Sequence, residues 1–161
     1  MEARHEYRIN ILGTAPRRGV VHAENISPSL SFSAPPEFQG EAGCWTPEHF
    51  LVASVATCFA STFSGMAEKS KFEYVSFRME NEGELGVADT GLRFTEIRLR
   101  PTVTILREGD RGMALRLVEK AEKSCLIARS LNCKIVVKAT IKLEEEILLP
   151  AFVPEVTTLR I

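Results

Sequence analysis

The sequence predicts an α+β fold with the element order βββ-α-ββ-α-β and mainly antiparallel sheets. Three observations predict this fold. Short runs that alternate apolar and polar residues occur near the start, in the middle and near the end of the chain, as expected of strands. Two longer stretches, residues 48–70 and 110–125, suit helices and lie between these groups of strands. The length of 161 residues fits one domain, predicted to span residues 1–161.

The first three strands are predicted near the N-terminus. Residues 5–12 (HEYRINIL) and 18–24 (RGVVHAE) form a predicted hairpin whose turn is carried by GTAPRRG, residues 13–19. Residues 28–33 (PSLSFS) alternate in the same way and form the third short strand. Residues 34–45 are rich in Pro and Gly, so they are predicted to form a loop that leads into the first helix.

The first helix is predicted over residues 48–70. Thr46 suits the N-cap, Pro47 the first helical position and Glu48 the positive end of the helix dipole. The stretch 50–66 is apolar or small on every side, which predicts a helix buried on all its faces. One chain of 161 residues has little material to cover such a helix, so this stretch favours a partner subunit.

A long hairpin and a second helix are predicted to follow. Residues 72–85 and 92–106 alternate as strands do, and the pattern after Phe94 needs a register adjustment, which predicts a bulge. Apolar residues at helical spacing within residues 110–125 predict an amphipathic helix. This helix would deliver Cys125 at or just past its end.

The chain ends in a predicted last strand, residues 132–146, and an apolar extension, residues 144–161. The strand alternates apolar and polar residues. The extension contains two prolines and is expected to pack on the body of the protein. The core of the domain is therefore predicted over about residues 5–143.

Composition and charge argue against several classes of partner. The chain has 20 basic and 21 acidic residues, so no basic excess favours nucleic acid or an anionic membrane. Five Ser and Thr residues interrupt the apolar stretch 50–66, which is expected to fall short of the about 20 apolar residues of a membrane span. The N-terminus carries acidic residues and no apolar signal segment. We therefore expect a cytoplasmic protein with no nucleic-acid and no membrane partner.

Four cysteines are the candidate chemical groups. They form no C-x-x-C pair and the three histidines have no ligand spacing, so no metal site is expected. From the residues alone, Cys58 is either a small buried core residue or a thiol that the chain presents. Cys125 follows a lysine at a helix end, which favours a thiolate there. Cys133 is interpreted as core, Cys44 as core or an exposed loop thiol, and His49 as a helix-surface residue.

The region around Cys58 resembles a known family. The stretch GCWTPEHFLVASVATCFASTF, residues 43–63, is followed 67 residues after Cys58 by AEKSCLIARSL, residues 121–131. This pattern resembles the osmotically inducible protein family, OsmC, with its organic hydroperoxide resistance branch, Ohr. In that family a Gly-rich loop leads into a P-E motif, which opens a buried helix carrying a peroxide-attacking cysteine. A second cysteine lies at the end of the second helix.

The resemblance implies roles for five side chains. Cys58 corresponds to the cysteine that attacks the peroxide as a thiolate, and Cys125 to the cysteine that resolves it as a disulfide. Because an apolar helix core raises the pKa of a thiol, a cation must approach it. In the Ohr branch this cation is an arginine of the first hairpin, held by the P-E glutamate. Arg17 matches it best, Arg18 is the second choice, and Glu48 matches the glutamate. The two arginines could instead be solvated turn charges, and Glu48 a first-turn acid that only complements the helix dipole.

The implied function is a thiol-dependent peroxidase that reduces organic hydroperoxides to alcohols. An external dithiol would recycle it, with no cofactor and no metal, in an intertwined homodimer. Phe50, Phe59 and Phe63 would line an apolar substrate-binding pocket. The alternative is a non-enzymatic OsmC-like dimer that binds a small apolar ligand or senses redox state.

Two departures from the family pattern place the chain in a divergent branch. Relatives often have C-P-x-S or C-x-x-S at the resolving cysteine, whereas this chain has CLIARS and therefore no proline after Cys125. Cys44 and Trp45 precede the P-E motif, where Gly or Thr and Asn are usual.

Overall fold

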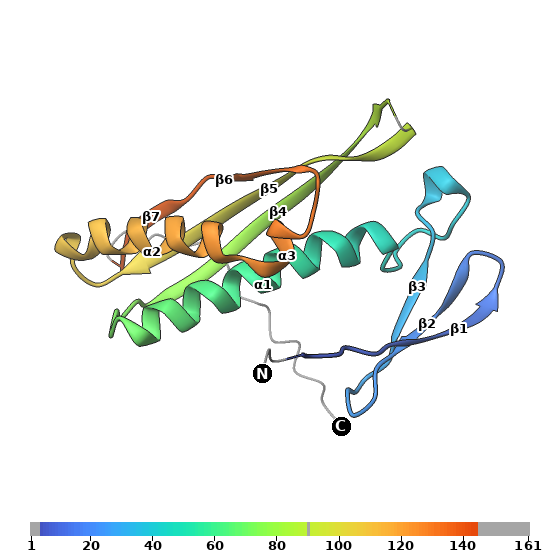
Figure 1. Cartoon of the computed structure of the whole chain (residues 1–161), viewed down its shortest axis with the longest axis horizontal. Coiled ribbons are helices and arrows are strands. Elements are labelled where there is room, and N and C mark those ends of the chain that lie inside the picture. The colour runs from blue at the N-terminus through green and yellow to red at the C-terminus, as the bar shows by residue number, and fades with distance from the viewer. Residues whose placement is uncertain (1–3, 90, 145–161) are drawn as a thin grey trace, which may run out of the picture. The chain divides into compact units, whose positions relative to one another are not determined.

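The computed structural model describes residues 4–89 and 91–144 (Figure 1). The chain divides into two compact units, Met1–Val55 and Ala56–Ile161. The boundary lies inside the long helix α1, Pro47–Lys69. The single-domain organisation expected from the length stays a prediction. The expected apolar extension, residues 144–161, lies outside the described residues except for Glu144.

The first unit contains a three-stranded antiparallel sheet, in the order β1-β2-β3. Its strands are β1 (Asn10–Ala15), β2 (Arg18–His22) and β3 (Leu30–Ser33). The three predicted strands are therefore confirmed, but the first begins at Asn10 rather than at residue 5. The sequence between residues 5 and 9 alternates like a strand, but the register of β1 with β2 begins only at the pair Asn10–His22.

The β1–β2 turn holds a non-glycine residue in a left-handed conformation. Pro16 and Arg17 make the turn, and Arg17 has a φ of 61°. This backbone region is comfortable for glycine and costs other residues about 1–2 kcal/mol. The carbonyl of Arg17 accepts a hydrogen bond from the Ala34 N–H at 2.9 Å, which ties the turn to the end of β3. Arg17 is therefore held in place by the strand connections around it.

A short 3-10 helix, η1 (Pro36–Phe38), lies in the loop that leads to α1. Thr46 caps α1 as predicted: its hydroxyl accepts the backbone N–H of His49 at 3.3 Å. The ring Nδ1 of His49 in turn accepts the backbone N–H of Thr46 at 3.3 Å. This is the reciprocal arrangement of a capping box, with histidine in place of the usual Glu or Gln. The predicted helix is confirmed and starts one residue earlier, at Pro47.

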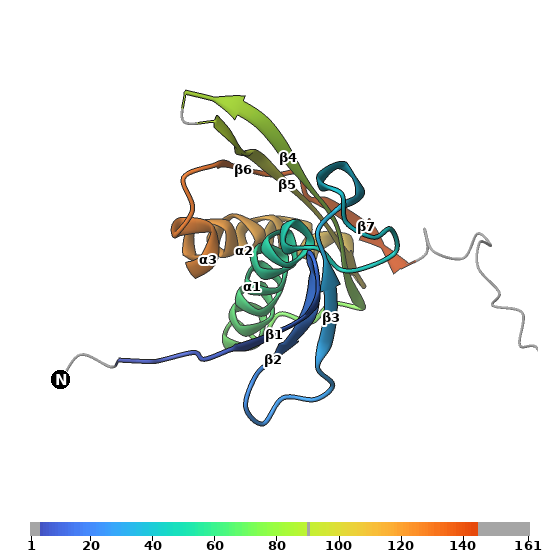
Figure 2. The same ribbon diagram turned by 90° about the vertical axis from the view of Figure 1, so that its right-hand side faces the viewer.

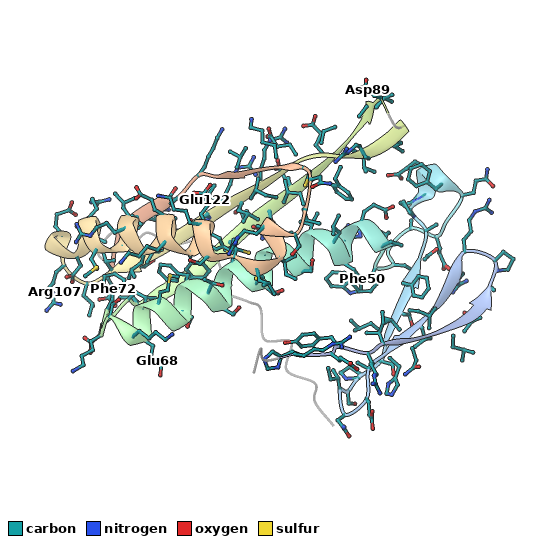
Figure 3. The ribbon with its side chains drawn as sticks, in the orientation of Figure 1. Phe50, Glu68, Phe72, Asp89, Arg107 and Glu122 are labelled. Atoms are coloured by element: carbon teal, nitrogen blue, oxygen red, sulfur yellow. The ribbon has the colours of Figure 1, made fainter. Side chains whose placement is uncertain are left out.

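The second unit is built on a long hairpin, β4 (Ser76–Ala88) and β5 (Gly91–Ile105). Its strands are antiparallel, and the register shifts between Glu84 and Leu85, opposite Thr95 of β5. This shift is the bulge that the pattern after Phe94 predicts. Asp89 lies at the free tip of the hairpin (Figure 3).

The last predicted strand is two strands in the structure. It is split into β6 (Lys134–Val137) and β7 (Thr140–Leu143), and both pair with β5 in parallel. The Lys138 N–H donates to the carbonyl of Leu99 at 2.9 Å, so the chain stays beside β5 across the break. The sheet of this unit is therefore mixed, but its longest pairing, β4 with β5, is antiparallel, as is the whole sheet of the first unit. The predicted α+β class with mainly antiparallel sheets is confirmed.

Two further helices follow β5 after a short 3-10 helix, η2 (Glu108–Asp110). They are α2 (Arg111–Ser124), as predicted, and a single turn, α3 (Leu126–Arg129), which the sequence did not predict. Figures 1 and 2 show α2 side by side with α1 over one face of the β4–β5 hairpin. The core between these layers is apolar. Its fully buried large side chains include Phe59, Phe63, Ile97, Leu99, Ile105 and Leu117.

Helix α1 buries one stripe rather than all its faces. Its buried side chains are Val55, Phe59, Phe63 and Ala67, which follow one another at intervals of four residues. Thr57, Ser61 and Ser64 on other faces are exposed. One chain therefore does not bury this helix all round, and burial of its other faces by a partner subunit stays a prediction. Its 23 residues and mean hydropathy of 1.6 also meet the length and composition of a membrane span, contrary to the expectation, but the core helix of a soluble protein meets them too.

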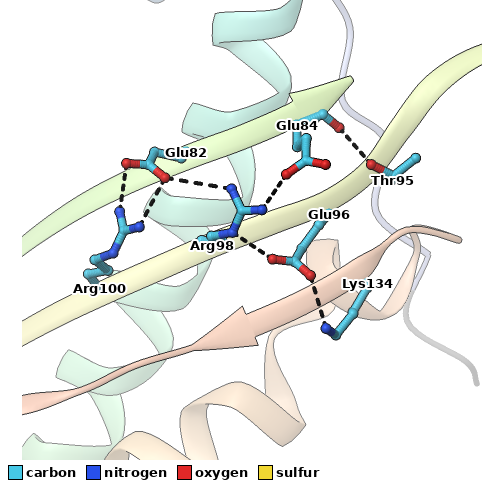
Figure 4. Close-up of polar contacts among 7 residues, drawn as sticks. All are labelled: Glu82, Glu84, Thr95, Glu96, Arg98, Arg100 and Lys134. Carbon is cyan, nitrogen blue, oxygen red and sulfur yellow. Dashed lines mark hydrogen bonds and ion pairs between the residues drawn. The ribbon is translucent and has the colours of Figure 1, made fainter. Parts of the chain in front are cut away.

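The opposite face of the hairpin is charged (Figure 4). Arg98 of β5 lies among three carboxylates: it contacts Glu82 at 3.7 Å, Glu96 at 2.6 Å and also Glu84. Lys134 of β6 contacts Glu96 from the other side at 2.9 Å. Glu96 and Arg98 alternate in sequence with the buried Ile97 and Leu99 of β5, as the two-residue period of a strand requires.

Candidate active site

Two cysteine thiols of the second unit lie together. Cys58 stands on α1 one residue before the buried Phe59, and it is partly exposed. Cys125 is wholly buried at the junction of α2 and α3. Each side chain is a hydrogen-bond partner of the other, and the two cysteines are not joined in a disulfide. The structure therefore brings together the two cysteines that the sequence singles out.

The junction at Cys125 exposes backbone donors to the Cys58 sulfur. Cys125 has an extended backbone (φ −63°, ψ 110°), so α2 stops there and α3 starts afresh. The first N–H groups of a helix have no partner within it. Here the N–H of Ile127 donates to the Sγ atom of Cys58 at 3.5 Å. The restart of the helix thus supplies a hydrogen bond to the sulfur.

The two thiols differ in acidity. Burial by itself would raise the pKa of Cys58, but hydrogen bonds from the backbone of Ile127, the Cys125 thiol, the backbone of Leu126 and the Thr62 hydroxyl lower the pKa below its ordinary value. Burial raises the pKa of Cys125, and the neighbouring Cys58 raises it further. Cys58 is thus the more acidic thiol of the pair and Cys125 the less acidic one.

The three charged residues expected at the site belong to the first unit. Arg17 is the exposed left-handed residue of the β1–β2 turn, and Arg18 pairs with Glu41 at 2.7 Å. Glu48 lies in the first turn of α1, where its Oε2 atom is buried and has no hydrogen-bond partner among the described residues. A pairing of Glu48 with Arg17 stays a prediction, as does the approach of either arginine to Cys58.

The three phenylalanines expected to bind substrate have different surroundings. Phe50, labelled in Figure 3, is partly exposed and stacks on Trp45, with ring centroids 5.7 Å apart. Phe59 and Phe63 are wholly buried, and Phe63 stacks on Phe77 of β4 with centroids 4.7 Å apart. Phe59 and Phe63 therefore belong to the core in this chain, and their contact with a substrate stays a prediction.

The two remaining cysteines lie apart from this pair in the sequence. Cys44 is partly exposed and lines an open hollow of about 300 Å³, together with Gly43, Trp45 and His49. Cys133, next to β6, is partly exposed rather than core as interpreted. Among residues 4–89 and 91–144, no three His, Cys, Asp or Glu side chains are grouped as metal ligands would be.

Sequence reasoning missed the donors that surround Cys58. The sequence predicts a guanidinium beside Cys58. Within the second unit, the groups that lower the pKa of Cys58 include backbone N–H groups and a hydroxyl one helical turn after Cys58. The hydroxyl could have been found, because Thr62 follows Cys58 by four residues and lies on the same helix face. The backbone donors depend on where α2 stops, and Cys125 carries no proline or glycine signal for that stop.

Comparison with known proteins identifies the family of this chain. The family model described as OsmC-like protein matches residues 40–140. The chain belongs to the OsmC-like family. The family includes cysteine-based hydroperoxide peroxidases. A relative from Bacillus subtilis (strain 168), the uncharacterized protein YmaD, is 31% identical over 133 residues, which cover 80% of this chain and 87% of YmaD.

Solved structures of OsmC-like proteins share the fold. An OsmC-like protein of unknown function from Vibrio cholerae has a TM-score of 0.76 and 19% identity, covering 84% of this chain and 99% of its own. An organic hydroperoxide resistance protein OsmC from Legionella pneumophila has a TM-score of 0.70 and 25% identity, covering 88% and 99%. The organic hydroperoxide resistance protein OhrB of Bacillus subtilis has a TM-score of 0.62 and 18% identity, covering 86% and 98%.

Proposed function

We propose that this OsmC-like protein is a thiol-dependent peroxidase that reduces organic hydroperoxides to alcohols. The observation that carries the proposal is the unequal thiol pair. Cys58 is partly exposed with a lowered pKa, while Cys125 is wholly buried with a raised pKa. A peroxidatic cysteine must be a thiolate that the substrate can reach, and a resolving cysteine must wait nearby as a thiol. The exposure of Cys58 and the opposite directions of the two pKa shifts support these two roles.

The proposed reaction has three steps. The Cys58 thiolate attacks the terminal oxygen of ROOH, the O–O bond breaks, and the alkoxide takes up a proton to leave as an alcohol. Cys58 is thereby oxidised to a sulfenic acid. The Cys125 thiol then attacks the sulfenic sulfur, releasing water and forming the Cys58–Cys125 disulfide. An external dithiol reduces this disulfide by exchange and is itself oxidised.

Arg17, with Arg18 as second choice, is proposed to approach Cys58 and favour its thiolate further, held by Glu48. Two features of the first unit support this role. Arg17 keeps a left-handed backbone that glycine would adopt at lower cost, and such strain tends to persist at functional positions. The buried Oε2 of Glu48 lacks a partner among the described residues, and a guanidinium would satisfy it.

The proposed working form is a cytoplasmic homodimer. A second copy would cover the faces of α1 that one chain leaves open. Phe50, Phe59 and Phe63 are proposed to contribute apolar surface near the peroxide, which would favour alkyl hydroperoxides over hydrogen peroxide. The proposed partners are the hydroperoxide, the dithiol and the second subunit, with no nucleic acid and no membrane.

The decisive experiment is peroxide consumption by the purified protein with a dithiol present. Wild type should consume cumene hydroperoxide, and Cys58→Ser should abolish consumption while circular dichroism stays unchanged. Cys133→Ser is the matched control and should keep the activity. Peptide mapping after one equivalent of peroxide should find a Cys58–Cys125 disulfide.

Two results would contradict the proposal. Most of the activity remaining in Cys58→Ser would remove the attacking role from this residue. A wild-type protein that binds apolar compounds but consumes no hydroperoxide would favour the non-enzymatic alternative.

A further inference from the structure

The backbone carbonyl of Cys58 is offered more donors than it can accept. As in any α-helix, the N–H of Thr62 points to it from one turn ahead. The Ser61 hydroxyl donates to the same oxygen at 3.0 Å, and the Thr62 hydroxyl donates to it at 2.8 Å. A carbonyl oxygen has two lone pairs, so one of these three donors is in surplus.

Thr62 is the donor that has another acceptor within reach. Ser61 is exposed, whereas Thr62 is partly buried and its hydroxyl also contacts the Cys58 thiol. If the Thr62 hydroxyl turns to the sulfur, Ser61 and the helical N–H still satisfy the carbonyl. Turning toward a thiolate therefore leaves no buried acceptor without a hydrogen bond.

Backbone groups face the sulfur from the other side. The Ile127 N–H donates to Sγ of Cys58 at 3.5 Å, and the backbone of Leu126 contributes to lowering the pKa of Cys58. Both groups lie in the first turn of α3, where a helix offers them no internal acceptor. The titratable group that faces Cys58 from this junction is the Cys125 thiol.

We propose that the Thr62 hydroxyl and the backbone N–H groups of Leu126 and Ile127 form a donor cradle that holds the Cys58 sulfur as a thiolate. Thr62 and Leu126 are positioning residues, because they act on peroxide only through Cys58. The catalytic meaning of the cradle rests on the proposed peroxidase function. The ionisation of Cys58 does not, and it can be measured without peroxide.

Leu126 gives the cradle a member that a single substitution can remove. Relatives with proline after the resolving cysteine lack an N–H at this position. The extended backbone of Cys125 is the conformation that a residue before proline prefers, and Leu126 is the first residue of α3, where proline is well tolerated. Its side chain is 66% exposed. Leu126→Pro should therefore remove the donor and leave the fold intact.

The test is the rate of iodoacetamide alkylation of Cys58 against pH, followed by mass spectrometry of the peptide that contains Cys58. Thr62→Val keeps the side-chain shape and removes the hydroxyl, while Thr62→Ser keeps the hydroxyl. Leu126→Pro removes the N–H, while Leu126→Ala keeps it. Because hydrogen bonds to a charged group are strong, each removal should slow alkylation at neutral pH by about three- to tenfold. Each matched control should follow wild type.

The pH profiles of alkylation test the donor cradle independently of the proposed peroxidase function. Profiles displaced to higher pH in Thr62→Val and Leu126→Pro, but not in their controls, support the cradle even if the protein consumes no hydroperoxide. A Thr62→Val or Leu126→Pro profile that superimposes on wild type overturns the cradle even if peroxide is consumed. An equal displacement in Thr62→Ser or Leu126→Ala also overturns it, because the donor is then irrelevant. Circular dichroism and thermal unfolding of all four variants establish that the folded state is compared.

Discussion

The sheets of the two units differ in how much of their apolar surface is covered. In the second unit, β5 alone buries Ile97, Leu99, Val103 and Ile105 almost completely against its neighbours. In the first unit, all six residues of β1 are exposed. Ile11 and Leu12 point to opposite faces of this strand and are 57% and 68% exposed. Among the described residues, the second unit thus buries the middle of its sheet, while strand β1 of the first sheet leaves apolar side chains exposed.

The residues of the proposed chemistry are divided between these two units. The unequal cysteine pair and its hydrogen-bond donors all lie in the self-covered unit. The residues proposed to supply and hold the extra positive charge, Arg17, Arg18 and Glu48, lie in the unit with the uncovered sheet. Exposed apolar surface of this kind favours association with another surface. Thiolate formation should therefore depend less on assembly than the proposed activation by arginine does.

The largest effect should come from the core of the second unit. Phe63→Ala removes a wholly buried ring that stacks on Phe77, and it should lower the free energy of unfolding by about 3–5 kcal/mol. Urea denaturation measures this loss. Thr57→Ala, on an exposed face of the same helix, is the control and should change little. A small loss in Phe63→Ala would mean that the second unit does not rest on this core.

The next effect concerns the uncovered sheet. If a second copy covers it, Ile11→Glu places a charge in the contact and should shift the mass from twice 17.9 kDa toward 17.9 kDa. Light scattering at micromolar concentration measures the mass. Leu115→Glu, at a 42% exposed position of α2, is the matched control and should keep the dimer. A folded wild-type protein of 17.9 kDa would contradict the dimer itself.

A smaller effect is expected at the β1–β2 turn, with opposite signs for stability and chemistry. Arg17→Gly relieves the left-handed strain and should raise the free energy of unfolding by about 1 kcal/mol. It also removes the proposed cation, so alkylation of Cys58 should need a higher pH. Arg18→Ala should displace the alkylation profile less, and Glu48→Ala in the same direction but more weakly than Arg17→Gly. Unchanged profiles in both arginine variants would leave the donors around Cys58 as the sole source of its acidity.

The smallest effect should come from the charged face of the β4–β5 hairpin. Arg98→Gln removes the central residue of the ion-pair network in Figure 4. The charged side chains of this network are in contact with water, and salt screens their attraction, so each pair contributes little to stability. The change in stability should be small beside that of Phe63→Ala and should shrink further at high salt. Denaturation at two salt concentrations measures it. A loss as large as that of Phe63→Ala would show that this face is not merely solvated.

The sequence predicted the features that depend on neighbouring residues better than those that depend on contacts between distant parts of the chain. Thr46 and Pro47 located the start of α1, and apolar spacing located the end of α2 at Cys125, because caps and periodicity act within one or two turns. The pairing direction of β6 and β7 was missed because the residues of a strand do not state whether its neighbour runs parallel. Burial of α1 on all its faces could not be decided from the sequence for the same reason, since the exposure of a helix depends on which surfaces pack on it from elsewhere in the chain or from a partner.

The candidate site divides in the same way. The pair of Cys58 and Cys125 could be inferred, because a distinctive local pattern surrounds each of them. The donors on the Cys58 sulfur could not, because they arise where α2 breaks and α3 begins. No glycine or proline in the sequence marks the break between α2 and α3. The residue at the break, Cys125, is buried, so its conformation depends on tertiary packing.

The complete burial of Cys125 bears on how a Cys58–Cys125 disulfide would be reduced. In thiol exchange, the sulfur of lower pKa is the better leaving group, so chemistry favours an incoming dithiol that attacks Cys125 and expels Cys58 as a thiolate. Cys125 is 0% exposed, however, so the chemically preferred sulfur is the one that a reductant cannot touch without local opening. The single turn of α3 begins directly after Cys125, so we expect its displacement to uncover this sulfur. The rate of recycling would then be set by the opening of α3, and it would level off as the concentration of reductant rises.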